Sequence, residues 1–159
     1  MGRRYTVPFE NITVSVPQDL ASIIPDFGSF PASAAKLLRV WVFCTNTTLP
    51  TAQQLSLRVR RLQTMVVGSG GSVPGEFPDD PGDTASHYVG RVNDTTKATG
   101  TPDWTYEFGC YLYTGADLVF SDAPVCNGND GFVFELLSTV STAVILSGGL
   151  LFEEIGSGL

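Results

Sequence analysis

The stretch TYEFGCYLY, residues 105–113, places a large or apolar side chain at every second position. A β-strand turns successive side chains to opposite faces of its sheet, so this period of two predicts a strand with one buried face. The same period recurs over residues 5–9 and 12–16. Pro8 and Pro17 lack the backbone donor that a sheet interior needs, so these two segments should lie at a sheet edge or end there.

Further strands are expected along the rest of the chain. The run Val40–Cys44 is apolar at every position, which predicts a central strand covered on both faces. Residues 54–62 fit both a helical stripe and a strand, and we interpret them as a strand. Gly148 and Gly149 interrupt the last strand and indicate a bulge or a bend. The remaining expected strands are residues 87–93, 117–121, 131–137 and 143–154.

Together these segments decide the fold class. Nine strand-like segments and no convincing amphipathic helix predict an all-β fold, an antiparallel β-sandwich of the jelly-roll kind. The length of 159 residues fits one domain over residues 1–159. Residues 68–83 are rich in glycine and proline, and we expect them to form a long exposed loop.

Charge and hydropathy exclude several classes of partner. The formal net charge is −7, so the field of the chain repels phosphate backbones and we expect no nucleic-acid partner. No apolar run reaches the length of about 18 residues that a membrane span needs, and we expect no membrane association. Only 16 % of the residues are charged, which suits strand faces that pack against other subunits.

The three cysteines do not indicate a disulfide framework or a zinc site. Cys44, Cys110 and Cys126 are an odd number without a CxxC pair, as in proteins of a reducing cytoplasm. Cys44 and Cys110 lie in apolar runs and should be small buried side chains, whereas Cys126 lies in a polar turn and is the candidate among the three for an exposed thiol.

No catalytic or metal-binding motif stands out. His87 is the single histidine and no nucleophile motif accompanies it, so we interpret it as a surface or hydrogen-bonding residue. Glu107 and Glu135 are carboxylates on expected strands, but nothing pairs them as a glycosidase would require. The acidic turns at residues 79–83 and 127–131 fit ordinary turn chemistry better than calcium loops. We therefore expect no enzyme activity, no metal and no cofactor.

Aromatic residues leave a second class of function open. Trp41 and Trp104, with the tyrosines at 106, 111 and 113, could form a platform on which a sugar ring stacks. Trp41 lies in an apolar run and is expected in the core, whereas Trp104 lies at a strand start and is the better candidate for exposure.

Three stretches carry a resemblance to a known group of proteins. The opening YTVPF (residues 5–9), RVNDTT (residues 91–96) and the closing LSGGLLFEE (residues 146–154) resemble small accessory virion proteins of tailed bacteriophages. The resemblance implies a head decoration or cement protein that binds and stabilises the outer capsid lattice. Its partners would then be the major capsid protein and further copies of itself, and it would be made in the host cytoplasm and reside on the capsid exterior.

Within that hypothesis the N-terminal segment is the expected contact. Arg3, Arg4 and Tyr5 are the capsid-contact candidates, in an arm whose removal should leave the melting transition nearly unchanged. A homotrimer is the expected assembly, because cement proteins commonly occupy local three-fold positions. The alternative is a carbohydrate- or receptor-binding adsorption module of a phage particle, and a jelly-roll hydrolase is a weaker third hypothesis.

Overall fold

The computed structural model describes residues 2–26 and 33–156, and these residues form strands and no helix. No membrane-spanning helix is therefore found among them. The strands are β1 (Arg3–Val14), β2 (Gln18–Pro25), β3 (Ser33–Cys44), β4 (Gln54–Val66), β5 (Phe77–Pro78), β6 (Tyr88–Asp94), β7 (Thr99–Tyr111), β8 (Ala116–Val119), β9 (Val125–Asn127), β10 (Gly131–Leu136) and β11 (Val144–Gly156).

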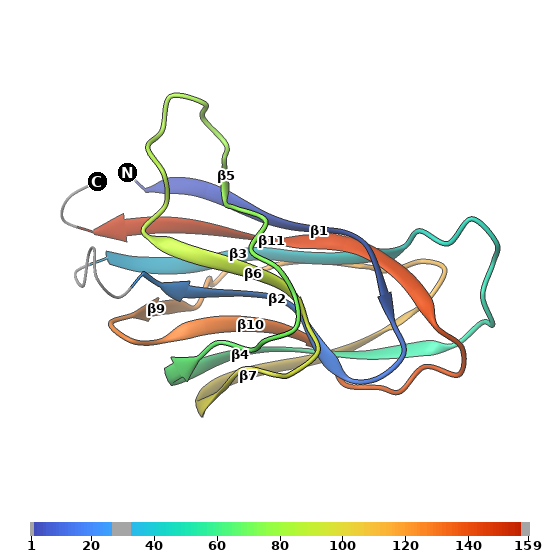
Figure 1. Cartoon of the computed structure of the whole chain (residues 1–159). Helices are drawn as coiled ribbons and strands as arrows, with labels where there is room; N and C mark the ends of the chain where they lie inside the picture. Colours follow the sequence, from blue (N-terminus) through green and yellow to red (C-terminus); the bar gives the residue numbers. More distant parts are fainter. Residues whose placement is uncertain (1, 27–32, 157–159) are drawn as a thin grey trace.

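The strands form two antiparallel sheets that pack face to face (Figure 1). Sheet A has the order β5-β1-β11-β3-β8, with β9 also paired to β3, and sheet B has the order β6-β2-β10-β4-β7. The all-β sandwich predicted from the period of two is confirmed. The core between the sheets is built from the inward residues of both, among them Tyr5, Phe9, Phe132, Phe134 and Phe152.

Strand β1 joins two segments that the sequence analysis separated. Its register with β11 shifts between Phe9 and Ile12, so the chain continues as one strand through an irregularity. The short β5 pairs with β1 at Tyr5 and Thr6 alone, which leaves Pro8 on the open edge. Pro17 lies in the turn before β2. The edge and end positions predicted from the two prolines are confirmed.

The doubly covered strands are β2 and β10, not β3 as the apolar run predicted. Every residue of β2 and of β10 is buried, because segments outside sheet B cover its outer face. In β3, Trp41 is half-buried and Phe43 is 47 % exposed. The prediction for β3 was wrong because Trp41 and Phe43 lie on the outer surface of the sheet. In the sequence, aromatic residues at such positions give the same pattern as residues on a second buried face.

Strand β2 was missed entirely. Its sequence QDLASIIP has no clean alternation, because the outward positions Asp19 and Ser22 are polar and yet buried. A buried polar side chain needs partners that lie far away in sequence. The backbone N–H of Ala98 supplies one by donating to Asp19 Oδ2 at 2.6 Å.

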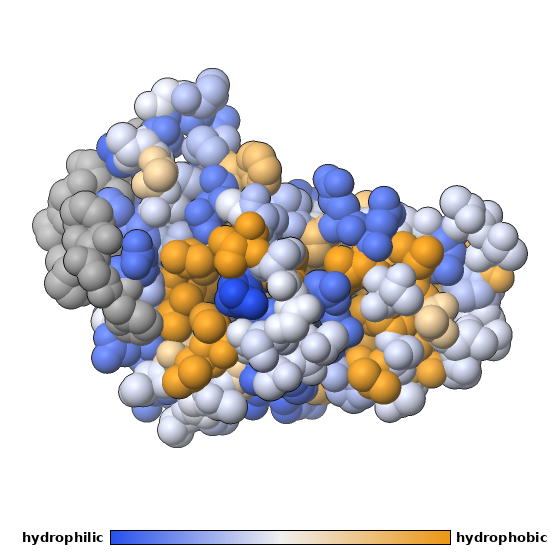
Figure 2. Space-filling view, viewed as in Figure 1, coloured by the Kyte–Doolittle hydropathy of each residue, from blue (hydrophilic) through white to orange (hydrophobic). Residues whose placement is uncertain are grey.

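The Gly/Pro-rich segment of residues 68–83 is exposed in part only. Gly68 is buried, and two isolated bridges, Ser69 with Thr96 and Ser72 with Val92, fasten the segment across sheet B. On the face shown in Figure 2, hydrophilic residues separate the hydrophobic patches from one another. The later half of the segment contributes β5 and then rises above β1 as the projecting loop in Figure 1.

Gly148 and Gly149 lie inside an unbroken β11, and the predicted irregularity lies in the neighbouring strand β1 instead. A Cβ atom on Gly149 would lie 2.7 Å from Cζ2 of the Trp41 indole. Glycine is therefore required at this position so that the indole ring can lie against the outer face of sheet A.

Candidate binding surface

The outer face of sheet A carries an ordered set of side chains, most of which are partly or fully exposed. The pairing registers align them in rows across the strands. We call this surface the A face; its rows are Arg4–Glu153–Lys36, Thr6–Leu151–Arg39–Val119, Pro8–Gly149–Trp41–Asp117 and Ser147–Phe43.

Trp41 occupies the middle of the A face and is held on two sides. The Arg39 guanidinium lies 4.6 Å from the centre of the indole ring, a cation–π contact, while Gly149 provides the floor. Arg39 also donates two hydrogen bonds to Asp117, at 2.7 and 2.8 Å, and these hold the pKa of that carboxyl below its usual value. The ring is thus fixed in place before any partner binds, which lowers the entropy cost of binding.

The A face differs in charge from the rest of the chain. Its charged members are three basic and two acidic residues, namely Arg4, Lys36, Arg39, Glu153 and Asp117. The whole chain has a net charge of −7, so this face is locally free of the excess negative charge. Phe43 and Val119 add exposed apolar area beside Trp41. Aromatic residues with few charges are the composition of protein–protein interface centres.

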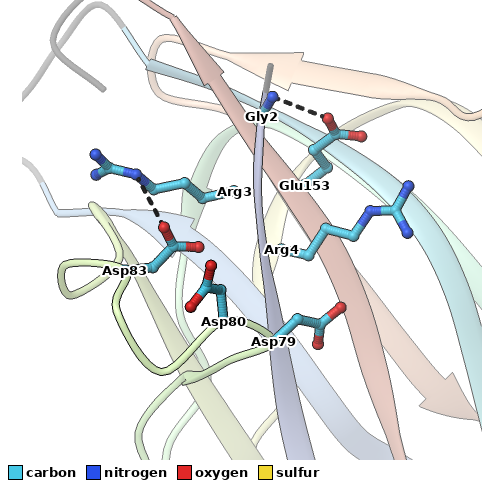
Figure 3. A pocket seen from close by; sticks show the side chains of 7 residues that line it. All are labelled: Gly2, Arg3, Arg4, Asp79, Asp80, Asp83 and Glu153. Carbon is cyan, nitrogen blue, oxygen red and sulfur yellow. Dashed lines mark hydrogen bonds and ion pairs between the residues drawn. The ribbon is translucent and has the colours of Figure 1, made fainter.

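A cleft lies where the A face meets the projecting loop. Figure 3 shows this cleft, whose volume is about 420 Å³. Arg3 forms an ion pair with Asp83 at 3.5 Å, and the backbone N–H of Gly2 donates to Glu153 at 3.1 Å. The remaining lining residues are Arg4, Asp79 and Asp80. The cleft is therefore a zwitterionic surface with its basic groups partly neutralised by its own acidic loop.

The structure separates the three predicted contact residues. Arg4 is exposed at the end of the A face, and Arg3 is half-buried against Asp83. Tyr5 is fully buried, stacks on Phe152, and donates from its hydroxyl to the Thr84 carbonyl oxygen at 2.8 Å. Tyr5 is thus a core residue and cannot contact a partner, whereas the roles of Arg3 and Arg4 stay predictions.

The expected N-terminal arm is also corrected. Residues 3–5 belong to β1 and pair with β11, while Met1 lies outside the described residues. Removing residues 1–5 would delete Tyr5 from the core, so an unchanged melting transition is no longer expected. Point substitutions of Arg3 and Arg4 are the appropriate test of a contact role.

The candidate catalytic residues have structural partners. His87 Nδ1 lies 2.5 Å from the buried Glu154, which also accepts hydrogen bonds from the Ser86 hydroxyl and the His87 backbone. Glu135 is buried among cationic side chains on the outer face of sheet B. These contacts agree with the hydrogen-bonding role predicted for His87. Glu135 faces outward from sheet B as predicted, but it is buried rather than exposed to solvent.

Across residues 2–26 and 33–156, no group of three or more metal-ligating side chains lies close enough to hold an ion. The predicted turns at 79–83 and 127–131 close through their own backbone, with Asp83 N–H donating to Asp80 and Asp130 N–H to Asn127. Chelation should therefore leave the melting temperature unchanged. Thermal unfolding with and without a chelator measures this, and a loss of several degrees would contradict it.

The cysteines and the two tryptophans depart from the sequence expectations. Cys126 is buried rather than exposed, and burial raises the pKa of its thiol to about 12. Cys44 is half-buried and Cys110 is buried.

Trp104, the better candidate for exposure in the sequence, packs edge-on against Phe120 and Phe132, whereas Trp41 lies on the outer face of sheet A. The glycine pair in β11 was the one sequence feature linked to the outward position of Trp41, and a single sequence does not tell which residue those glycines accommodate.

A comparison with models of known protein families finds no match, and a comparison with curated protein sequences finds none either.

Proposed function

We propose that this protein is a non-enzymatic structural component of a tailed-phage particle, a head decoration or cement protein that binds the outer capsid lattice through the A face. The observation that carries the proposal is the pre-organised Trp41, flanked by exposed Phe43 and Val119 on a face with little charge. A rigid aromatic anchor in such a surface is the usual energetic centre of a protein–protein contact.

The exposure and the charge of the A face also support a role in binding a partner. In sheet B the chain itself covers the outer side of β2 and β10, whereas the outer face of sheet A carries exposed Arg4, Phe43 and Val119 that a partner can reach. Arg4 and Lys36 place positive charge at one end of the A face, where an acidic patch of a shell protein would be attracted. The proposal also includes the major capsid protein as the partner, self-association of the protein on the shell, and a location on the capsid exterior.

The test is occupancy of virions. Particles from the phage that carries this gene should contain the protein in many copies per head, measured by quantitative mass spectrometry against the major capsid protein. Replacing the exposed aromatic side chain, Phe43→Glu, should lower occupancy at least about tenfold, because a buried unpaired charge weakens an interface strongly.

The matched control is Val66→Glu, which adds the same charge at a 62 % exposed apolar position on sheet B. Occupancy of this variant should equal that of the unchanged protein. Equal loss in both variants, or absence of the protein from heads, would refute the proposal. A few copies per particle would indicate a tail location instead.

One observation favours the adsorption module as a second candidate. A cavity of about 410 Å³ on the A face is lined by Trp41, Arg39 and Asp117, which combine a ring surface with polar groups as a sugar site does. Binding to a glycan array that Trp41→Ala abolishes, together with low copy number in virions, would establish this function in place of decoration.

A further inference from the structure

Each of the two sheets has two edges, and three of these four edges, as formed by the described strands, are protected against pairing with another chain. Strand β8 has four residues, and Ser72 bridges the outer side of β6. The third edge is formed by the two-residue β5 and then by β1, where Pro8 offers no donor. Short edge strands, prolines and covering segments are the usual devices that prevent a second chain from pairing there.

Strand β7 is the exception. It is 13 residues long and lies at the outer edge of sheet B, with no strand beyond it in Figure 1. Its register with β4 runs without a break from Trp104 to Tyr111. This part of the edge contains no proline and has Glu107 as its single charged side chain.

The direction of the free backbone groups follows from two hydrogen bonds. Leu112 N–H donates to Gln53 on the β4 side, and Leu137 N–H donates to Ser56 on the opposite side of β4. Since bonding direction alternates along a strand, the N–H and C=O groups of Thr105, Glu107 and Gly109 point away from β4. These groups therefore form an open ladder at the edge of the sheet.

No contact among the described residues requires glycine at position 109. A Cβ atom there would meet nothing closer than the Leu55 carbonyl oxygen at 3.4 Å, and the residue is not in the left-handed region. Glycine weakens a strand interior, so its presence there often marks a place where another backbone approaches closely.

We propose that β7 pairs with β7 of a second copy of this chain across a two-fold axis at Phe108. In that antiparallel register Glu107 of each copy faces Gly109 of the other, and both residues present their backbone groups to the partner. The one charged side chain of the edge is thus placed opposite the one residue without a side chain. Glu107 keeps its ion pair with Arg58, at 3.6 Å, and like charges do not oppose each other.

The pairing also accounts for the aromatic side chains at this edge. Tyr106 is 45 % exposed although its ring contacts Phe108 and Phe120, because β7 ends the sheet. A second β7 would cover it and continue sheet B through the axis. Such a contact uses the same surface on both copies and closes after two, which makes the assembly a dimer.

Sedimentation velocity over concentrations on the order of 1–100 μM should show a dimer. Gly109→Pro removes a central donor that has no partner among the described residues, and should raise the dissociation constant at least about tenfold. Gly109→Ala keeps the donor and fits the space beside Leu55, so this control should still dimerise. Both variants should retain the melting transition of the folded domain.

Cross-linking tests the register without relying on the proline variant. A mixture of Glu107→Cys and Gly109→Cys proteins should form a disulfide-linked pair, because facing residues in a bonded pair lie about 5.5 Å apart between Cα atoms. The Glu107→Cys protein alone should not form a disulfide, because the introduced cysteine of one copy would lie two residues along the strand from the introduced cysteine of the other. A monomer at the highest concentration, the trimer expected from the phage resemblance, or cross-linking by Glu107→Cys alone would overturn the proposal. It does not depend on the capsid role.

Discussion

Glu135→Gln should be among the most destabilising single substitutions in this protein, lowering the free energy of unfolding by about 3–5 kcal/mol. Glu135 is completely buried on the outer face of sheet B. Its carboxylate contacts the guanidinium of Arg58, lies 3.0 Å from Arg60 Nε, and lies 3.0 Å from Lys97 Nζ. Glutamine removes the negative charge, so Arg60 and Lys97 lose their carboxylate partner in a poorly solvated site, and Arg58 keeps only its pair with the exposed Glu107.

Glu107→Gln is the matched control for this prediction. Glu107 pairs with the same Arg58, at 3.6 Å, but its side chain is largely exposed. An exposed pair contributes about 1 kcal/mol or less, so chemical unfolding of this variant should differ little from the unchanged protein. If denaturant titration gave the two variants similar small effects, Glu135 would not be the centre of a stabilising network.

The contrast between these two glutamates shows where sequence reasoning stops. Both lie on strands and alternate with apolar residues, so the pattern assigns each to a wet face. Glu135 is buried because the segments around Gly68 and Lys97 cross the outer face of sheet B. That crossing depends on contacts between residues far apart in the chain, which a local period cannot report.

The same reason explains which elements were predictable. Strands with one wet face, such as β1 and β6, alternate and were found. Strand β2 is buried on both faces with polar residues inside, so it has no period to detect. On the A face, the sequence indicated that Gly148 and Gly149 were special, but their role as the floor under Trp41 required the pairing of β11 with β3.

Asp19 should make the stability of this protein depend on pH in the direction opposite to that of an ordinary surface carboxylate. The residue is 2 % exposed, and its Oδ1 atom has no hydrogen-bond partner among the described residues. Burial raises the pKa of Asp19 to about 7, although the N–H of Ala98 opposes the shift. Of the neighbouring charges, Glu135 and Asp94 also raise it, and Lys97 lowers it.

The sign of the effect follows from the two protonation states. The unfolded chain titrates Asp19 near 3.8 and the folded chain near 7, so folding favours the protonated form. Between pH 4 and pH 7 the folded state binds more protons than the unfolded state, and this contribution to stability is lost as the pH rises. At 1.36 kcal/mol per pKa unit, the loss is on the order of 4 kcal/mol by pH 8.

Asp19→Asn isolates this contribution from the titration of all other carboxylates. Asparagine keeps an oxygen acceptor for the Ala98 N–H but carries no charge at any pH. Denaturant unfolding of both proteins at pH 4, 6 and 8 should therefore show the variant gaining stability relative to the unchanged protein as the pH rises. The gain should be largest at pH 8, where the unchanged protein holds an ionised carboxylate in a buried site. A difference between the two proteins that stays constant from pH 4 to pH 8 would show that Asp19 titrates alike in the folded and unfolded states, and the buried acid would then have no part in the pH response.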